Sequence, residues 1–197
     1  MTAAGTDELL FESDDDKQPS GFSPDGKLLL FSRLLAGKKG IDVWALPMDG
    51  DRKPFPVVST PYNEFAAAFS ADGRSIAYAA DDSGSEQIYV EPFPATGFKA
   101  QLTRDGGEWP TWSADGRTIF YSSLHRTLWS VDVATNEHAI RSATPRRLMS
   151  RPFLGSAFGS FAVSPSGDRF LLIVPAQHEN ESRSLQITLN WPALLHR

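Results

Sequence analysis

The chain has no cysteine and only four histidines in 197 residues. The lack of cysteine excludes thiol nucleophiles, disulfides, iron–sulfur clusters and cysteine zinc sites. The histidines are too far apart in sequence for a short metal-ligand motif: His125, His138, His178 and His196. We therefore expect them in surface loops or the tail, and we assign no catalytic residue and no metal ligand.

A basic excess and a long apolar run are also missing. Lys and Arg number 19 against 24 Asp and Glu, which gives a net charge of −5 and argues against a nucleic-acid binder. The longest apolar run, at 170–174, is far shorter than the ~18 residues of a membrane helix. The N-terminus has no basic and apolar regions of a signal peptide. These features predict no nucleic-acid or membrane partner and favour a cytoplasmic location.

One short phrase recurs four times. It starts with an apolar residue and serine and continues to a turn containing glycine, at 22–27, 69–74, 112–117 and, in degenerate form, 163–168. Its glycines stand at 26, 73, 116 and 167, so the spacings are 47, 43 and 51 residues. A period of about 40–50 residues is typical of propeller blades.

Each copy predicts a β-hairpin turn, because Asp bonds nearby backbone N–H groups and Gly supplies a positive φ without steric cost. Apolar β-rich runs follow at 28–31, 75–78, 118–121 and 170–174. Third strands are predicted at 41–46, 87–91, 127–131 and 185–189, and fourth strands at 55–58, 100–103 and 147–149. Sustained helical periodicity is absent. The sequence therefore predicts an all-β protein with four four-stranded units.

These units predict one β-propeller domain over residues 1–197. Its blades span about 18–60, 61–104, 105–150 and 151–197. The last unit lacks a fourth strand and residues 7–13 supply an extra one, so the N-terminal strand is expected to complete the last blade.

Three arrangements fit that expectation. One chain can close on itself as a four-bladed ring, two chains can share an eight-bladed ring as a homodimer, or the chain can be a piece of a larger propeller. We lean toward the dimer, because blades of ordinary twist are hard to close at four.

The phrases at 22–27 and 69–74 resemble the TolB-type, WD-like Pro-Asp repeat of β-propellers, and the resemblance covers about 8–191. The chain is most similar to the C-terminal propeller of bacterial Ser/Thr protein kinase-associated proteins, through 63–65, 89–94 and 189–191. The kinase signatures themselves are absent: there is no Gly-rich loop with its Lys, no His-Arg-Asp loop and no Asp-Phe-Gly. The resemblance implies protein–protein interaction or ligand sensing by analogy of fold.

The innermost strand of each propeller blade lines the central channel, so polar residues at its start can face a pocket. Here these residues are Gln18, Asn63, Glu64 and Glu108, with Trp109 beside them. Converging carboxylates and amides can bind a polar ligand or calcium, since oxygen ligands suit that ion. The alternative is that they bond exposed backbone at the rim. We predict a ligand-binding rim without a cofactor, calcium being the alternative.

Other polar groups have simpler interpretations. The acidic run at 14–16 lacks the spacing of a calcium-binding loop and is expected to be a solvated connection. A basic strip is expected to be a solvated loop: Arg141, Arg146, Arg147 and Arg151. Three tryptophans are expected to pack between blades: Trp44, Trp112 and Trp129.

Together these observations favour a non-catalytic propeller scaffold that binds a protein or a small molecule at the mouth of the channel. The alternative is a propeller hydrolase or lactonase that uses channel carboxylates and a divalent cation. That alternative requires at least three oxygen ligands converging at the channel, whereas a scaffold requires none.

Overall fold

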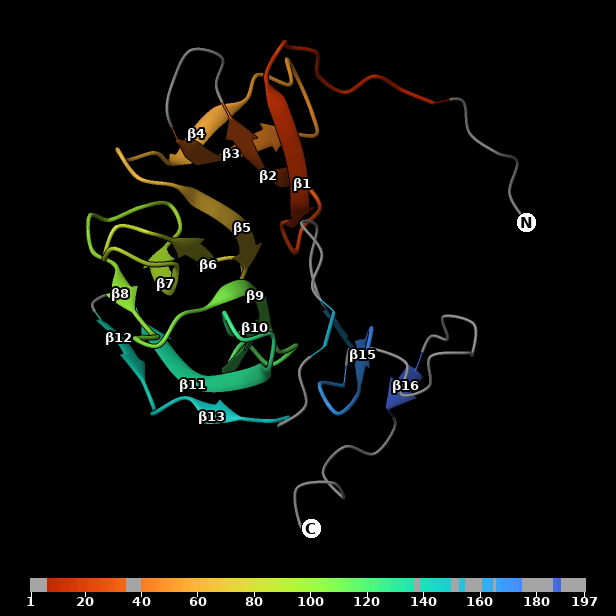
Figure 1. Cartoon of the computed structure of the whole chain (residues 1–197). Helices are drawn as coiled ribbons and strands as arrows, with labels where there is room; N and C mark the ends of the chain where they lie inside the picture. The colour runs from red at the N-terminus through yellow and green to blue at the C-terminus, as the bar shows by residue number, and fades with distance from the viewer. Residues whose placement is uncertain are drawn as a thin grey trace.

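The computed structural model describes residues 7–34, 40–136, 139–149, 153–154, 161–164, 166–174 and 186–188. Strands are the regular elements of these residues, which contain no helix long and apolar enough to cross a membrane. The strands form four antiparallel sheets that follow one another along the chain (Figure 1). The all-β prediction is confirmed.

Each sheet is built from strands that are neighbours in sequence. The first contains β1 (Asp16–Phe22), β2 (Leu28–Leu34), β3 (Ile41–Pro47) and β4 (Phe55–Val58). The second contains β5 (Glu64–Phe69), β6 (Ser75–Ala80), β7 (Gln87–Pro92) and β8 (Ala100–Gln101). The third contains β9 (Glu108–Trp112), β10 (Thr118–Ser122) and β11 (Leu128–Asn136), and β11 pairs with both β12 (Ala139–Ser142) and β13 (Arg146–Arg147). The fourth contains β14 (Phe161–Val163), β15 (Phe170–Leu172) and β16 (Gln186–Thr188).

The repeated phrase forms the turn between the first two strands of each sheet. In the first copy the Ser23 hydroxyl donates to Asp25 Oδ1 at 2.6 Å and accepts from the Leu28 backbone N–H at 2.9 Å. Gly26 takes a φ of 72°, which an L side chain rarely adopts. The same serine–aspartate bond, again 2.6 Å long, closes the next two turns at Ser70–Asp72 and Ser113–Asp115. In each turn the serine hydroxyl is the main reason that the pKa of the aspartate lies below its ordinary value.

The degenerate fourth copy makes the same turn with a displaced carboxylate. Ser166 stands where the other copies have aspartate. The Ser164 hydroxyl donates instead to Asp168 at 2.9 Å and accepts from the Arg169 backbone N–H at 3.1 Å. Gly167 keeps the left-handed φ at 73°. The local geometry is therefore retained although the motif differs.

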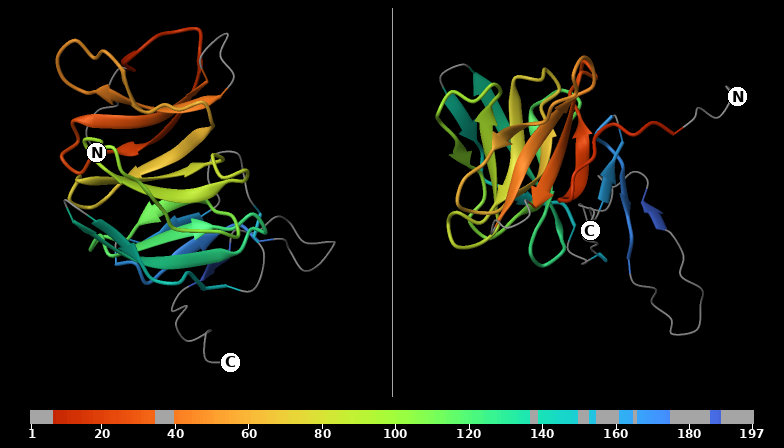
Figure 2. Two further views of the ribbon diagram at one scale, coloured as in Figure 1. Left: turned by 90° about the vertical axis from the view of Figure 1, so that its left-hand side faces the viewer. Right: turned by 90° about the horizontal axis from the view of Figure 1, so that it is seen from above.

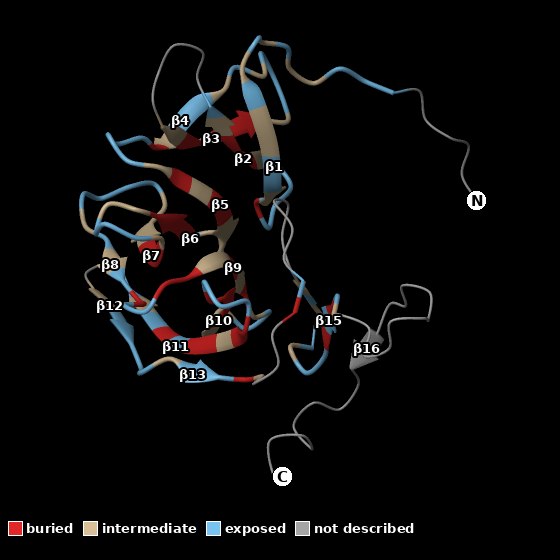
Figure 3. Cartoon of the chain, viewed as in Figure 1, coloured by how far each residue is buried: buried red, intermediate tan, exposed pale blue. Residues whose placement is uncertain are grey.

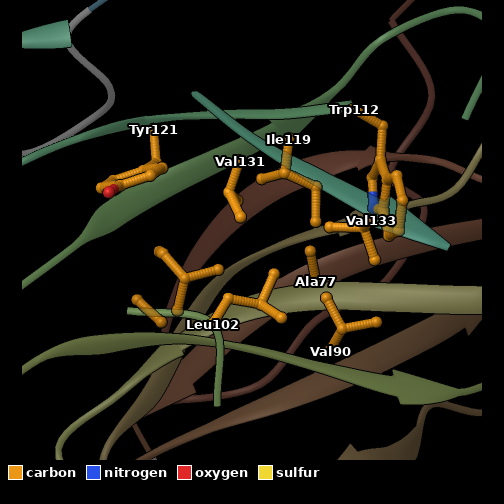
Figure 4. Packing of buried hydrophobic residues seen from close by; sticks show 10 residues of the cluster. Ala77, Val90, Leu102, Trp112, Ile119, Tyr121, Val131 and Val133 are labelled. Carbon is orange, nitrogen blue, oxygen red and sulfur yellow. The ribbon is translucent and has the colours of Figure 1, made fainter. Parts of the chain in front are cut away.

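Neighbouring sheets pack face to face through alternate residues of their central strands (Figures 2 and 3). The first and second sheets share a cluster that includes Leu30, Val43, Ile76 and Tyr78. The second and third share one that includes Ile88, Val90, Ile119 and Val131 (Figure 4). The third and fourth meet through Phe120, Leu128, Phe153 and Phe170. Sequential sheets stacked in this way are the architecture of propeller blades.

The expected strand at 7–13 is wrong: these residues form no strand and pair with none of the described strands. They lie instead on the first sheet, where the Phe11 ring is 6.4 Å from that of Phe31. The Arg33 guanidinium lies 5.7 Å from the Phe11 ring and 4.5 Å from the Trp44 ring. Packing on this outward face of the first sheet buries apolar surface that edge pairing would leave exposed. Of the predicted pairing partner, 185–189, residues 186–188 form β16, which pairs with β15 and not with residues 7–13.

Candidate functional site

The first strands of the sheets carry the residues that the sequence places at the channel rim. β1, β5 and β9 lie toward the middle of the molecule in Figure 1. Gln18 is within β1, where it pairs in register with Ser32. Glu64 begins β5 directly after Asn63, and Glu108 begins β9 and precedes Trp109.

Asn63 joins the first sheet to the second. Its side-chain amide donates to Asp81 Oδ2 at 2.6 Å, and its backbone N–H donates to Asp81 Oδ1 at 2.9 Å. Its own Oδ1 accepts from the backbone N–H of Ile41 at 3.1 Å, at the start of β3. Both ends of this amide are therefore bonded to the protein.

Glu64 is buried beside Asn63, with 1% of its surface exposed. Its carboxylate accepts hydrogen bonds from the Thr60 hydroxyl and from the Thr60 backbone N–H, the latter at 3.3 Å. Burial raises the pKa of Glu64, and the negative charge of Asp42 adds to the rise, while the Thr60 hydrogen bonds oppose it. Glu64 thus holds the loop that leads into β5.

Glu108 forms a carboxyl pair with Glu86. The pairing is fixed by the backbone, since the Gly107 N–H donates to the Glu86 carbonyl at 3.0 Å. Burial, followed by the hydrogen bond and the charge of Glu86, raises the pKa of Glu108 to about 7, and the nearby Arg126 works against the rise. Two carboxylates this close resist double ionisation, so the pair holds a proton up to neutral pH.

Trp109 sits at a β-bulge that directs its side chain toward the neighbouring blade. Its φ of 56° is unusual for a residue with a side chain, and Ala66, at the same place in the preceding repeat, has a φ of 54°. The register of both inner strands shifts at these points. The Trp109 ring contacts Phe65 edge to face, with centroids 6.3 Å apart. The bulge therefore joins two inner strands through an aromatic pair.

Most of the predicted rim residues fall into two groups according to the side chains they contact. Glu108 and Trp109 meet Glu86 and Phe65, where the second and third sheets adjoin. Asn63 and Glu64 belong to the junction of the first and second sheets. Sequence reasoning missed Glu86 and Phe65, although Glu86 directly precedes a predicted third strand and the blade topology brings that loop to the start of the next inner strand.

No three His, Cys, Asp or Glu side chains of the described ranges are grouped so that they could hold a metal ion. Within the acidic run, Asp15 receives a hydrogen bond from Arg33 Nε at 2.8 Å, so this part is a tie to the first sheet and not a solvated connection.

The tryptophans, arginines and histidines named in the sequence analysis lie in different parts of the structure. Trp112 packs between the second and third sheets, as expected, and its Nε1 donates to the Ala68 carbonyl at 3.2 Å. Trp44 instead lies against Arg33 on the outward face of the first sheet. Arg146 donates to Ser130 Oγ at 3.0 Å. His125 is exposed, and several residues lie outside the described ranges: His138, His178, His196 and Arg151.

No protein-family model matches the chain, and no curated protein matches its sequence. Solved structures are similar in fold. TolB from Acinetobacter baumannii has a TM-score of 0.59 at 23% identity, over 86% of this chain and 40% of that chain. An oligogalacturonate lyase in complex with manganese has a TM-score of 0.54 at 14% identity, over 85% of this chain and 47% of that chain. The β-propeller domain of Cps50 (Swd1) from Myceliophteria thermophila has a TM-score of 0.51 at 11% identity, over 73% of this chain and 48% of that chain.

These similarities and the stacked sheets identify the chain as a β-propeller protein. Its fold is that of the TolB-like propellers, as the repeated phrase predicts. The chain spans less than half the length of each of these three proteins. The number of blades in a complete ring and the narrower resemblance to kinase-associated propellers stay predictions.

Proposed function

We propose that the chain is a non-catalytic propeller module that holds a protein or small-molecule partner at the mouth of its channel, the end where β5 and β9 begin. The observation that carries this proposal is the juxtaposition of a carboxyl pair and an aromatic pair. Glu108, paired with Glu86, is followed directly by Trp109, which contacts Phe65. Loops at one end of a rigid propeller are a common place for binding residues.

The chemistry of this site favours a cationic group. Carboxylates attract it by charge, and the faces of tryptophan and phenylalanine rings attract it through their quadrupoles. An arginine or lysine side chain of a partner protein, or a small amine, has this chemistry. Because the pKa of Glu108 is raised to about 7, the carboxyl pair gains its second negative charge as the pH rises through neutrality. Cation binding is therefore expected to strengthen from pH 6 to pH 8.

A short arginine-containing peptide is a suitable probe. We expect calorimetric titration of the whole chain to give a several-fold tighter Kd at pH 8 than at pH 6. Glu108→Gln should weaken binding and remove the pH dependence, whereas Asp51→Asn, an exposed acid next to Lys53, should change neither. A Kd that is equal at both pH values, or that is insensitive to Glu108→Gln, would contradict the proposal.

One observation favours the hydrolase as a second candidate. A carboxyl group with a pKa of about 7 is matched to general acid–base catalysis at neutral pH. Turnover of an ester and lactone panel, extended to oligogalacturonates because of the similarity in fold to a lyase, tests it with and without added Ca²⁺ or Mn²⁺. Turnover that Glu108→Gln abolishes would replace the scaffold proposal, and no turnover with any substrate would end the enzyme alternative.

A further inference from the structure

A pocket opens between the second and third sheets, away from the residues of the channel mouth. Its volume of about 620 Å³ falls within the ~300–1,000 Å³ of small-molecule sites. Residues 101–106, the loop at 123–127 and the segment 142–147 form its walls, and Tyr121 and Trp129 line it from the third sheet. None of the residues that line it belongs to the carboxyl or aromatic pair described above.

Tyr121 presents its hydroxyl to this pocket. The residue as a whole is 3% exposed, and its hydroxyl forms no hydrogen bond with another described residue. Figure 4 shows its oxygen at the end of the ring directed away from Val131 and Ile119. Tyr78, which is fully buried, donates to Glu91 at 3.3 Å instead. Because the Tyr121 hydroxyl lines the pocket and bonds no described residue, it is available to bond a molecule there.

Trp129 offers the pocket an apolar ring whose polar edge is already satisfied. Its Nε1 donates to Thr127 Oγ1 at 2.8 Å, and Thr127 shares a 2.9 Å hydrogen bond with Ser123. The ring lies beside that of Tyr121, with centroids 6.4 Å apart and planes 24° from parallel. These contacts fix the orientation of a half-buried indole, which suits the apolar face of a ring-shaped ligand.

Two guanidinium groups give the pocket its charge. Arg104 and Arg147 line it, both are exposed, and neither forms an ion pair with another described residue. The adjacent Arg146 differs, because it donates to Ser130 at 3.0 Å and lies 3.5 Å from Asp132. Asp105 is the one acidic residue of the lining. A pocket with two unpaired cations is notable in a chain whose net charge is −5.

We propose that this pocket binds a small hydroxylated ring that carries one acidic group, either a carboxylate or a phosphate. Arg104 and Arg147 provide fork-shaped donors for the acidic group. The Tyr121 hydroxyl donates to the same molecule, and Asp105 accepts from its hydroxyl groups. Trp129 covers its apolar face. This site is independent of the cation-binding channel mouth, so either can fail without the other.

Calorimetric titration of the whole chain tests the proposal with three probes: D-glucuronate, glucose 6-phosphate and glucose. We expect at least one acid to bind at least tenfold more tightly than glucose. Tighter binding of glucuronate identifies the acidic group as a carboxylate, and tighter binding of glucose 6-phosphate identifies it as a phosphate. The proposal is overturned when neither acid binds at millimolar concentration, or when glucose binds as tightly as the acids.

Two pairs of variants locate the site. Arg147→Gln should weaken binding of the acid about tenfold or more, whereas Arg146→Gln should leave the Kd within about twofold. Tyr121→Phe removes only the hydroxyl and should weaken binding about three- to tenfold, while Tyr78→Phe, between the first and second sheets, should not. Equal losses in both members of either pair would place the ligand elsewhere and overturn the assignment.

Discussion

The apolar faces of the sheets are covered in different ways. The second and third sheets cover each other where they meet, whereas the outward faces of the first and fourth have no neighbouring sheet among the described residues. At the junction, Ile119 and Ile88 are fully buried in a cluster that both sheets supply. On the outward face of the fourth sheet, Leu171 and Ile173 remain 38% and 51% exposed. The alternation of side chains along the strands is the same in both places. The repeat therefore makes every sheet apolar on two faces, and its neighbours decide which face is buried.

The outward face of the first sheet is covered by a segment of the same chain and not by a neighbouring sheet. Its outward face carries Phe31 and Trp44, and the segment before β1 covers it with Phe11. Arg33 lies between the rings and is paired with Asp15, and both side chains are largely buried. This short segment thus covers part of an apolar face of the first sheet, whereas a neighbouring sheet covers the corresponding face of the second.

Two isoleucines test this comparison most directly. Ile119→Ala should lower the free energy of unfolding by about 3 kcal/mol, because it leaves a cavity between two packed sheets. Ile173→Ala, on the exposed face, should lower it by less than about 1 kcal/mol. Chemical denaturation followed by tryptophan fluorescence measures both. Equal losses would mean that the fourth sheet is covered in solution.

The ion pair under the N-terminal segment should have the next largest effect. Asp15→Asn leaves the Arg33 guanidinium without its buried partner and should cost about 2 kcal/mol of unfolding free energy. The matched control is Lys53→Gln, which removes an ion pair exposed to solvent and should cost less than about 0.5 kcal/mol. Denaturation midpoints compare them. A loss confined to Lys53→Gln would contradict the role of the segment.

Assembly is a third test of the outward faces. A homodimer is one of the three arrangements that the sequence leaves open, and a second copy would cover the exposed apolar side chains of the fourth sheet. We expect light scattering to give the mass of two chains, and Ile173→Asp to reduce it to one. Leu9→Asp, at an exposed leucine before the first sheet, serves as the control. A wild-type protein that stays monomeric at about 100 µM would end the dimer prediction.

The smallest expected effect concerns the half-buried carboxyl pair of Glu108 and Glu86. The pKa of Glu108 is raised from 4.5 to about 7, so the folded state binds more protons than the unfolded state between these values. Stability is therefore lost as the pH rises from about 4.5 through 7. Glu108→Gln should raise Tm by a few degrees at pH 8 and leave it unchanged at pH 4. Calorimetric scans at both pH values check the sign, and a lower Tm at pH 8 would refute it.

Local features of the sequence predicted most of the strands. The serine, aspartate and glycine of each phrase lie within a few residues, so the turn that they form follows from sequence alone. The segment at 7–13 was expected as a strand because its pattern allows one, but its placement depends on Arg33 and Trp44, which only the folded first sheet brings together. Of the fourth strand expected at 147–149, only Arg147 lies in a strand, β13. The long β11 also pairs with β12, an additional strand that the sequence did not indicate.

The candidate site could likewise be predicted only in part, because its residues come from different sheets. Glu108 was singled out by its position at the start of an inner strand. Its partner Glu86 was missed: its place before a predicted third strand was the available signal, but the two carboxyl groups meet only when the second and third sheets stack. The pocket next to Tyr121 and Trp129 depends on the same stacking, and Trp129 was expected only to pack between blades. Contacts within one sheet are readable from the period of the repeat, and contacts between sheets are not.

The serine–aspartate hydrogen bond in each hairpin turn affects how the protein responds to acid. One serine hydroxyl lowers the pKa of each of Asp25, Asp72 and Asp115, and the hydroxyls of Ser166 and Ser164 lower that of Asp168. Each of these hydrogen bonds is therefore intact above the ordinary carboxyl range and weakens as acid protonates the carboxylate. A drop in pH therefore weakens the four hairpin turns over the same pH range. We expect acid to destabilise the four sheets together and not to unfold one blade before the others.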